Sequence, residues 1–161
     1  MPLKPYVAKE KEYLVRMRRY FHAHPEVSLK EFETCRTIEA ELDHMGIPHQ
    51  RVGETGVYAW IDGTKKAPDS GRAGRAVVLR ADIDALAMDD LKTEEYASQN
   101  AGICHACGHD GHTAIGLGTA KLASELMDQL HGKIIFLFQP AEEGVRGAKS
   151  VVEKGRLDHV D

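Results

Sequence analysis

Two short apolar runs constrain the fold of this chain more than any other feature. Residues 76–82 and 133–138 are almost continuously apolar and lack the alternation expected when one face of a strand meets solvent. Such runs are typical of strands that are covered on both faces. A helix pattern follows each run along the chain, over about 111–130 and 145–154. This order of elements predicts an α/β fold in which helices pack against a mostly parallel sheet.

Two helices are also predicted in the first third of the chain. Apolar residues at helical spacing indicate one helix over about 7–21 and another over about 28–45. Ser28 and Glu31 have the spacing of a capping box, in which each side chain bonds the backbone amide of the other residue. Gly46 suits the left-handed position that follows a helix. The next predicted elements are a hairpin over 49–62 and a flexible surface loop over 63–74.

Composition excludes several classes of function. The chain has 161 residues, enough for one domain with a real core, and its net charge is -4. No basic cluster argues for nucleic-acid binding, and no apolar run approaches the ~20 residues of a membrane span. The first residues lack the apolar core of a signal peptide. The cysteine count of 3 is odd, which argues against a disulfide framework and predicts a cytoplasmic protein.

The stretch 103–113 is the strongest indication of chemistry in the chain. It contains three of the 9 histidines and two of the 3 cysteines. Imidazole and thiolate are ligands that Zn²⁺ and similar ions prefer, and the small residues between them allow the backbone to bend around one centre. The stretch therefore predicts a metal site on a loop, with a polar-rich turn as the alternative. Asp110 is expected to cap the helix that follows.

Carboxylates stand at the end of both apolar runs. Asp82 and Asp84 end the first run, and Glu142 and Glu143 follow the second. Sites in α/β sheets lie beyond the carboxyl ends of the strands, so these acids and the Cys/His stretch are expected at one edge of the sheet. One acid of a pair can bind a metal while its neighbour takes a proton from metal-bound water. The alternative for Glu142 and Glu143 is a favourable position at a helix N-terminus.

The turn between the first two predicted helices holds His22, His24 and Glu26. These side chains have the chemistry of metal ligands. The favoured alternative is that they bond the free amides and carbonyls at the adjoining helix ends.

Four segments together resemble the M20 metallopeptidase family: 21–26, 80–86, 105–114 and 138–144. The resemblance is to the amidohydrolases that act on N-acyl amino acids, which include hippurate, auxin-conjugate and aminobenzoyl-glutamate hydrolases. Segments 113–118 and 144–148 favour the last of these groups. The resemblance implies a zinc-exopeptidase-like catalytic domain with three αβα layers and a mostly parallel or mixed sheet. The implied reaction is hydrolysis of the amide between an acyl or aroyl group and an amino acid.

The resemblance also implies roles for individual residues. These are Cys107, His109 and Glu143 as metal ligands, Glu142 as the general base, Asp84 as the residue that orients the metal cluster, and His105, Asp110 and His112 beside the ligands. The implied cofactor is one or two divalent ions, Zn²⁺ or Mn²⁺. The implied partner is a small-molecule N-acyl amino acid substrate, without nucleic acid or membrane.

The chain departs from the family pattern in several places. Ala87 stands where a proline is usual, and Cys104 stands where an apolar residue is common. Family members are more than twice as long as this chain, and they carry two further metal-binding histidines and a lid or dimerisation domain. Residues 1–161 are therefore expected to form the N-terminal part of a catalytic domain that is incomplete at its C-terminus and lacks the lid.

Different classes of function remain open at this point. The first is a metal-dependent amidohydrolase that forms homo-oligomers at full length, while residues 1–161 alone are inactive and prone to self-association. The second is a non-catalytic fragment or metal-binding module. The third is a thiol redox module built on Cys104 and Cys107, which is disfavoured because the motif does not open a helix at its first cysteine.

Overall fold

The computed structural model of the chain describes residues 3–65, 75–144, 147–155, 157 and 160. The helices are α1 (Lys4–Lys9), α2 (Lys11–Ala23), α3 (Phe32–His44), α4 (His109–Glu125) and α5 (Gly147–Glu153), with a 3₁₀ helix at Met127–Gln129. The strands are β1 (His49–Val52), β2 (Gly56–Asp62), β3 (Ala76–Asp82) and β4 (Lys133–Gln139). Most of the predicted 63–74 loop and the first two residues of the predicted last helix lie outside the described residues.

The strands form a mixed sheet in the order β1-β2-β4-β3. β1 and β2 form the predicted hairpin, and β2 runs antiparallel to β4. Among the described strands, β3 and β4 are the one parallel pair. The α/β prediction is confirmed, and of the two alternatives expected for the sheet, mostly parallel or mixed, the mixed sheet is the one found. The direction of β2 depends on its pairing with the distant β4, and a run of apolar residues does not specify that direction.

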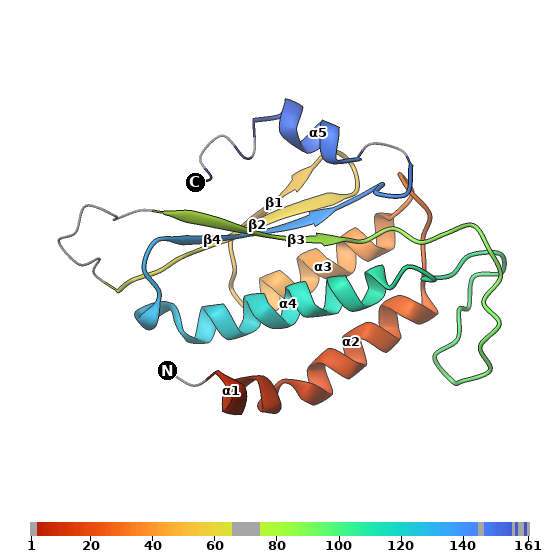
Figure 1. Cartoon of the computed structure of the whole chain (residues 1–161), viewed down its shortest axis with the longest axis horizontal. Coiled ribbons are helices and arrows are strands. Elements are labelled where there is room, and N and C mark those ends of the chain that lie inside the picture. Colours follow the sequence, from red (N-terminus) through yellow and green to blue (C-terminus); the bar gives the residue numbers. More distant parts are fainter. Residues whose placement is uncertain (1–2, 66–74, 145–146, 156, 158–159, 161) are drawn as a thin grey trace.

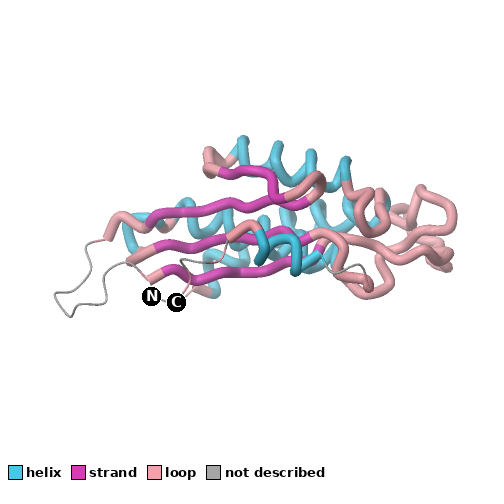
Figure 2. Tube along the Cα trace, turned by 90° about the horizontal axis from the view of Figure 1, so that it is seen from above, coloured by secondary structure: helices cyan, strands magenta, loops and turns pink. Residues whose placement is uncertain are grey.

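Helices cover both faces of this sheet (Figures 1 and 2). α2, α3 and α4 lie on one face, and α5 lies on the other, which gives three layers. The main core fills the space between the sheet and the larger helical layer, with Phe21, Ile38, Leu117 and Phe136 among its fully buried side chains. β4 is central and almost wholly buried, as its apolar run predicts. β3 is only partly covered, because it lies at an edge of the sheet. Val77 on this strand is 63% exposed.

The N-terminal helix is interrupted rather than continuous. The predicted helix over 7–21 is two helices, α1 and α2, which meet at Glu10. Glu10 is buried, and its carboxylate accepts a hydrogen bond from Lys121 Nζ of α4 at 2.6 Å. The break therefore coincides with a side-chain bond to a residue that lies 111 positions away in the sequence.

The predicted capping box at the start of α3 does not form. α3 begins at Phe32, and neither Ser28 nor Glu31 caps it. Instead, the Glu26 carboxylate accepts hydrogen bonds from the amides of Glu33 at 3.1 Å and Thr34 at 2.8 Å. Of the two alternatives for Glu26, the helix-end role is thus the one found. The local spacing of Ser28 and Glu31 is misleading because both side chains bond residues in other elements.

The helix after the Cys/His stretch begins earlier than predicted and ends sooner. α4 starts at His109 rather than Gly111, after Gly108 with a φ of 87°, and the last predicted turn is 3₁₀. α4 packs closely against the sheet, because a Cβ added at Gly116 would lie 2.8 Å from Phe138 Cε1 of β4. This packing fixes the N-terminus of α4 against the ends of β3 and β4.

Candidate metal centre

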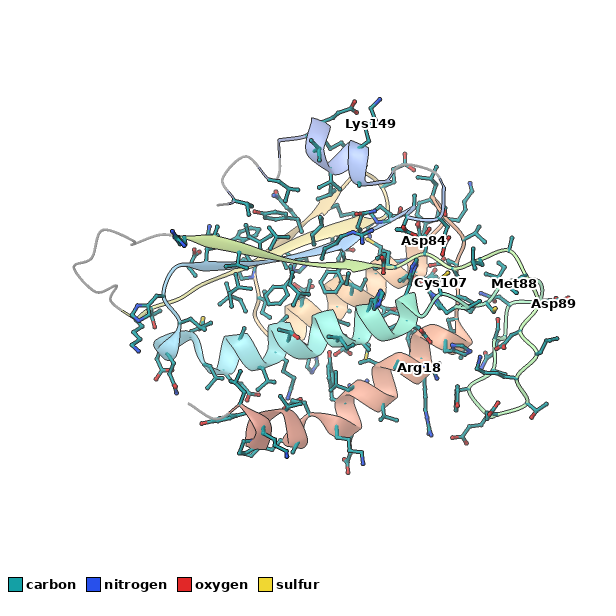
Figure 3. The ribbon with its side chains drawn as sticks, viewed as in Figure 1. Arg18, Asp84, Met88, Asp89, Cys107 and Lys149 are labelled. Carbon is teal, nitrogen blue, oxygen red and sulfur yellow. The ribbon has the colours of Figure 1, made fainter. Side chains whose placement is uncertain are left out.

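The predicted acids and the Cys/His stretch meet at one edge of the sheet. Asp82 is the last residue of β3, Asp84 follows it, and His109 opens α4. Glu142 and Glu143 follow the end of β4, the strand that pairs with β3. Figure 3 labels Asp84 and Cys107 at this end of the sheet. The topological prediction that these groups converge is confirmed.

His109 is oriented by Asp84. Its Nδ1 lies 2.8 Å from the Asp84 backbone oxygen and 3.3 Å from Asp84 Oδ1. Nε2 then faces Asp82 Oδ1 at 3.6 Å. The same nitrogen lies 3.9 Å from Glu142 Oε2 and 3.9 Å from Glu143 Oε1. Metal-binding histidines characteristically bond one ring nitrogen to a carbonyl or carboxylate, which leaves the other nitrogen free for the ion.

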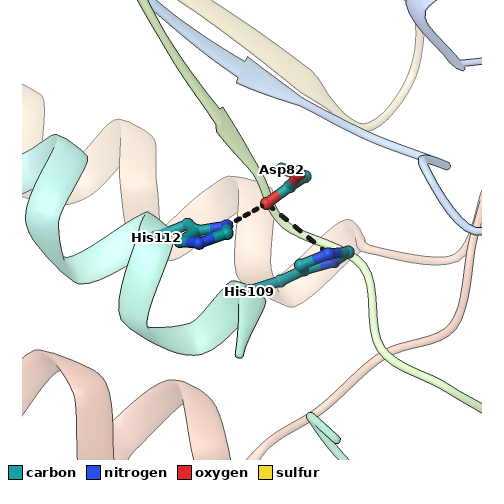
Figure 4. Close-up of side chains that lie close together, drawn as sticks. All are labelled: Asp82, His109 and His112. Atoms are coloured by element: carbon teal, nitrogen blue, oxygen red, sulfur yellow. Dashed lines mark hydrogen bonds and ion pairs between the residues drawn. The ribbon is translucent and has the colours of Figure 1, made fainter. Parts of the chain in front are cut away.

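Two groups of three residues share His109. The ligand atoms of Cys107, His109 and Glu143 lie within 4.8 Å of one another, as do those of Asp82, His109 and His112. Figure 4 shows the second group, in which His112 Nδ1 is 2.5 Å from Asp82 Oδ1. Thiolate, imidazole and carboxylate are a donor set that suits Zn²⁺, while the group without a thiol also suits harder ions such as Mn²⁺.

The charges around His109 favour a cation. Burial would lower the pKa of His109, but the carboxylates of Asp84 and Asp82 raise it to about 9. The carboxylate of Glu143 raises the pKa of the Cys107 thiol to about 11. Both groups therefore hold protons at neutral pH when no cation is present. A divalent ion would replace these protons and neutralise part of the surrounding negative charge.

Asp84 stays ionised in spite of its surroundings. Burial would raise its pKa, but hydrogen bonds from His109, from the Ser28 hydroxyl at 2.6 Å and from the Glu143 amide at 3.0 Å hold that pKa well below its usual range. A carboxylate that accepts several hydrogen bonds is stabilised in its charged form. Asp84 therefore remains an anion that connects His109 to the acidic turn.

The acidic turn, which we define as residues 140–144, has an unusual backbone. Ala141 has a φ of 53°, a left-handed conformation that costs a residue with a side chain about 1–2 kcal/mol. The Ala141 amide donates a hydrogen bond of 2.8 Å to Glu31 Oε1. Glu143 Oε1 is buried without a hydrogen-bond partner among the described residues, as a ligand atom for a cation would be.

The three residues expected beside the ligands differ in their surroundings. His112 joins Asp82, as described above. His105 is buried, neither of its ring nitrogens has a partner in the described part of the chain, and burial lowers its pKa to about 4. Asp110 faces α2, with His22 Nδ1 at 2.6 Å and Arg18 Nε at 3.0 Å from its Oδ2. Asp110 is not the N-cap residue of α4, which is Gly108, but its Oδ1 accepts a hydrogen bond of 2.8 Å from the Gly111 amide in the first turn.

Sequence reasoning missed several members of this network. The sequence places Asp82 at a strand end, two residues before Asp84, but gives no signal for its proximity to His109 and His112. Ser28 carried no signal for its bond to Asp84, because its spacing from Glu31 suggested a cap instead. For His22 the sequence favours a role at a helix end, whereas its side chain pairs with Asp110 across 88 positions of sequence.

The fold and the site together define an α/β protein with a candidate metal centre at the carboxyl edge of its sheet. The chain belongs to peptidase family M20/M25/M40, whose model matches residues 78–161. The resemblance seen in the four sequence segments is thereby confirmed.

Relatives share most of this chain but extend well beyond it. N-acetyl-L-cysteine deacetylase of Bacillus subtilis is 47% identical over 149 residues, which are 92% of this chain and 34% of that protein. N-acyl-L-amino acid amidohydrolase of Geobacillus stearothermophilus is 43% identical over 161 residues, which are 99% of this chain and 42% of that protein. The chain thus spans less than half the length of these relatives.

Solved structures show the same fold. The YXEP protein of Bacillus subtilis, described as a dinuclear metal binding peptidase from the M20 family, matches with a TM-score of 0.86 and 41% identity. The match covers 93% of this chain and 41% of that one. None of the helices in the described residues is both long and apolar enough to cross a membrane.

Proposed function

We propose that this chain forms part of the active site of a metal-dependent amidohydrolase that cleaves the amide bond of N-acyl amino acids. The observation that carries the proposal is the orientation of His109: Asp84 fixes Nδ1, and Nε2 faces a group of acids. The names of the two relatives, a deacetylase and an amidohydrolase, support the reaction and the substrate class.

Cys107, His109 and Glu143 are the proposed ligands of a Zn²⁺ or Mn²⁺ ion. Asp82 and His112 offer donor atoms for a second ion, which agrees with the dinuclear centre named for the YXEP protein. A bound ion would polarise the substrate carbonyl and lower the pKa of a coordinated water. Glu142, with a side chain 40% exposed beside His109, is the proposed general base that accepts the proton of that water. Asp84 keeps His109 in the required tautomer and orientation.

The activity is proposed for a longer protein. Because the chain spans less than half of its relatives, we propose that residues 1–161 are the N-terminal part of the catalytic domain. A downstream part would supply further ligands, the lid and the contacts of a homo-oligomer. The proposed location is the cytoplasm, and the proposed substrate is a small molecule rather than a nucleic acid or a membrane lipid.

Titration of the 161-residue chain with Co²⁺ tests the proposed ligands. We expect measurable binding with a thiolate charge-transfer band, weaker than at a site closed by four ligands. Binding should release protons and tighten as the pH rises, because Cys107 and His109 both hold protons in the metal-free site. Cys107→Ser should remove the band. A Co²⁺ complex of the parent chain without this band would exclude Cys107 as a ligand.

Hydrolysis distinguishes the amidohydrolase from a metal-binding module. The longer protein should release the amino acid from an N-acyl amino acid such as hippurate, and a chelator should abolish the reaction. Metal binding at the three ligands without any hydrolysis by the longer protein would instead support a module without catalysis.

A further inference from the structure

Glu31 is a buried acid that the proposed reaction does not use. Its side chain is fully buried, with an exposed fraction of 0%. It precedes α3 but does not cap that helix, since Glu26 takes the free amides there. A carboxyl group removed from water is costly unless a hydrogen bond compensates for the loss of hydration. The partner of Glu31 is therefore informative about why an acid occupies this position.

For Oε1 that partner is the backbone of the acidic turn, while Oε2 has no hydrogen-bond partner among the described residues. Glu31 Oε1 accepts a hydrogen bond of 2.8 Å from the amide of Ala141, the left-handed residue immediately before Glu142. Ala141 is itself fully buried. Its oxygen accepts a hydrogen bond of 2.9 Å from the Gly147 amide, so the backbone is held on both sides of the strained residue. A left-handed alanine persists where the surrounding structure fixes it.

Ser28, three residues before Glu31, also supports the acidic turn, through the side chain of Asp84. Asp84 Oδ2 accepts hydrogen bonds from the Glu143 amide at 3.0 Å and from the Ser28 hydroxyl at 2.6 Å. The supporting segment, which we define as residues 28–31, thus reaches the acidic turn twice. Glu31 does so directly, and Ser28 does so through Asp84. Leu29, between them, has a φ of 64°, which is rare for a residue with a side chain.

We propose that Glu31 is a positioning residue, which holds the acidic turn so that Glu143 and Glu142 face His109. This inference rests on the proposed function, because it assigns Glu31 a purpose in terms of those two acids. In this role Glu31 acts through the backbone of Ala141, whose amide it binds. Without an acceptor at this point, the buried amide would lose its partner and the left-handed turn would relax toward an ordinary conformation.

Substitutions at Glu31 separate this role from general stability. Glu31→Gln keeps an oxygen acceptor in the same place, whereas Glu31→Leu removes it and keeps the bulk. Ile38→Ala is the matched control, because Ile38 is also fully buried in the α3 region but packs in the main core. For each variant, Co²⁺ affinity of the 161-residue chain and the Tm of the metal-free chain are measured.

Glu31→Leu should weaken Co²⁺ binding by about 10–100-fold, the range found when a residue that supports a metal ligand is removed. Glu31→Gln should restore most of the affinity. Ile38→Ala should lower the Tm and leave the affinity close to that of the parent. An unchanged affinity in Glu31→Leu, or an equal loss in Ile38→Ala, would overturn the proposal.

Two further readouts keep the proposal testable. If Glu31→Leu does not fold, hydrogen exchange of the Ala141 amide tests the proposal instead. Exchange of this amide should be slow in the parent and in Glu31→Gln. Fast exchange in the parent would show that the bond between Ala141 and Glu31 is absent. A parent chain that binds no Co²⁺ would instead contradict the proposed function. Failure of the positioning role of Glu31 is therefore distinguishable from failure of the proposed function.

Discussion

Glu142 and Glu143 are neighbours in the sequence but have different surroundings. The Glu143 side chain is 24% exposed, and its amide is fixed by Asp84, while the Glu142 side chain is 40% exposed. In the longer, active protein, Glu142→Gln should lower the rate of hydrolysis by about 10²–10⁴-fold, because the glutamine side chain cannot accept a proton from the attacking water. Its metal content should stay near that of the parent. Activity and metal content are measured on the same preparation.

Glu143→Gln is the matched comparison for this experiment. It should lose metal, because an amide is a weaker ligand than a carboxylate, and activity should fall with the metal content. If Glu142→Gln lost the metal and Glu143→Gln kept it, the two proposed roles would have to be exchanged.

At the residue scale, the sequence predicted which side chains come together better than it predicted their individual hydrogen bonds. Cys107, His109 and Glu143 come together because each lies beside the end of an element whose position follows from the α/β order. The bonds of Ser28 to Asp84 and of Glu31 to Ala141 join residues 56 and 110 positions apart. Such pairs depend on how the helices and strands pack, and no local pattern encodes that packing.

At the element scale, Glu26 determines how α3 begins. Its carboxylate bonds two amides in the first turn and also accepts a hydrogen bond of 2.8 Å from Thr34 Oγ1. Glu26→Ala should lower the free energy of unfolding by about 1 kcal/mol, as for the loss of a helix cap. Glu26→Gln should lower the free energy of unfolding by less, because the side-chain amide oxygen of glutamine can still accept these hydrogen bonds. Urea denaturation of both variants measures the difference, and equal losses would argue against the capping role.

The existence of the elements was easier to predict than their ends. Helical spacing and continuous apolar runs identified α3, α4, β3 and β4, because burial of one face imposes that spacing. The observed ends of the helices differ from the predicted ends where a side chain from another segment forms a hydrogen bond there. Lys121 bonds Glu10 between α1 and α2, and Glu26 bonds the first turn of α3. The antiparallel direction of β2 was likewise set by its pairing with β4 rather than by its own residues.

At the scale of the whole molecule, β3 is one of the two outer strands and forms an open edge of the sheet. β3 has no neighbour beyond β4 among the described strands, and Val77 on β3 is 63% exposed. A groove of about 250 Å³ lies where β3 and β4 meet α5, lined by residues that include Val78, Leu137 and Val151. Val152, also at this groove, is 61% exposed. An open strand edge beside apolar side chains favours pairing with another chain.

We therefore expect the 161-residue chain, expressed by itself, to associate with further copies through the β3 edge. Val77→Lys should shift the population toward monomers, because a lysine on an edge strand opposes pairing between copies. Val7→Lys is the matched control: Val7 is 47% exposed in α1, away from the sheet edge, so its substitution should leave association unchanged. Sedimentation velocity over a range of concentrations measures the effect. A parent chain that stays monomeric at all concentrations, or an equal response to both lysines, would show that the β3 edge does not drive association.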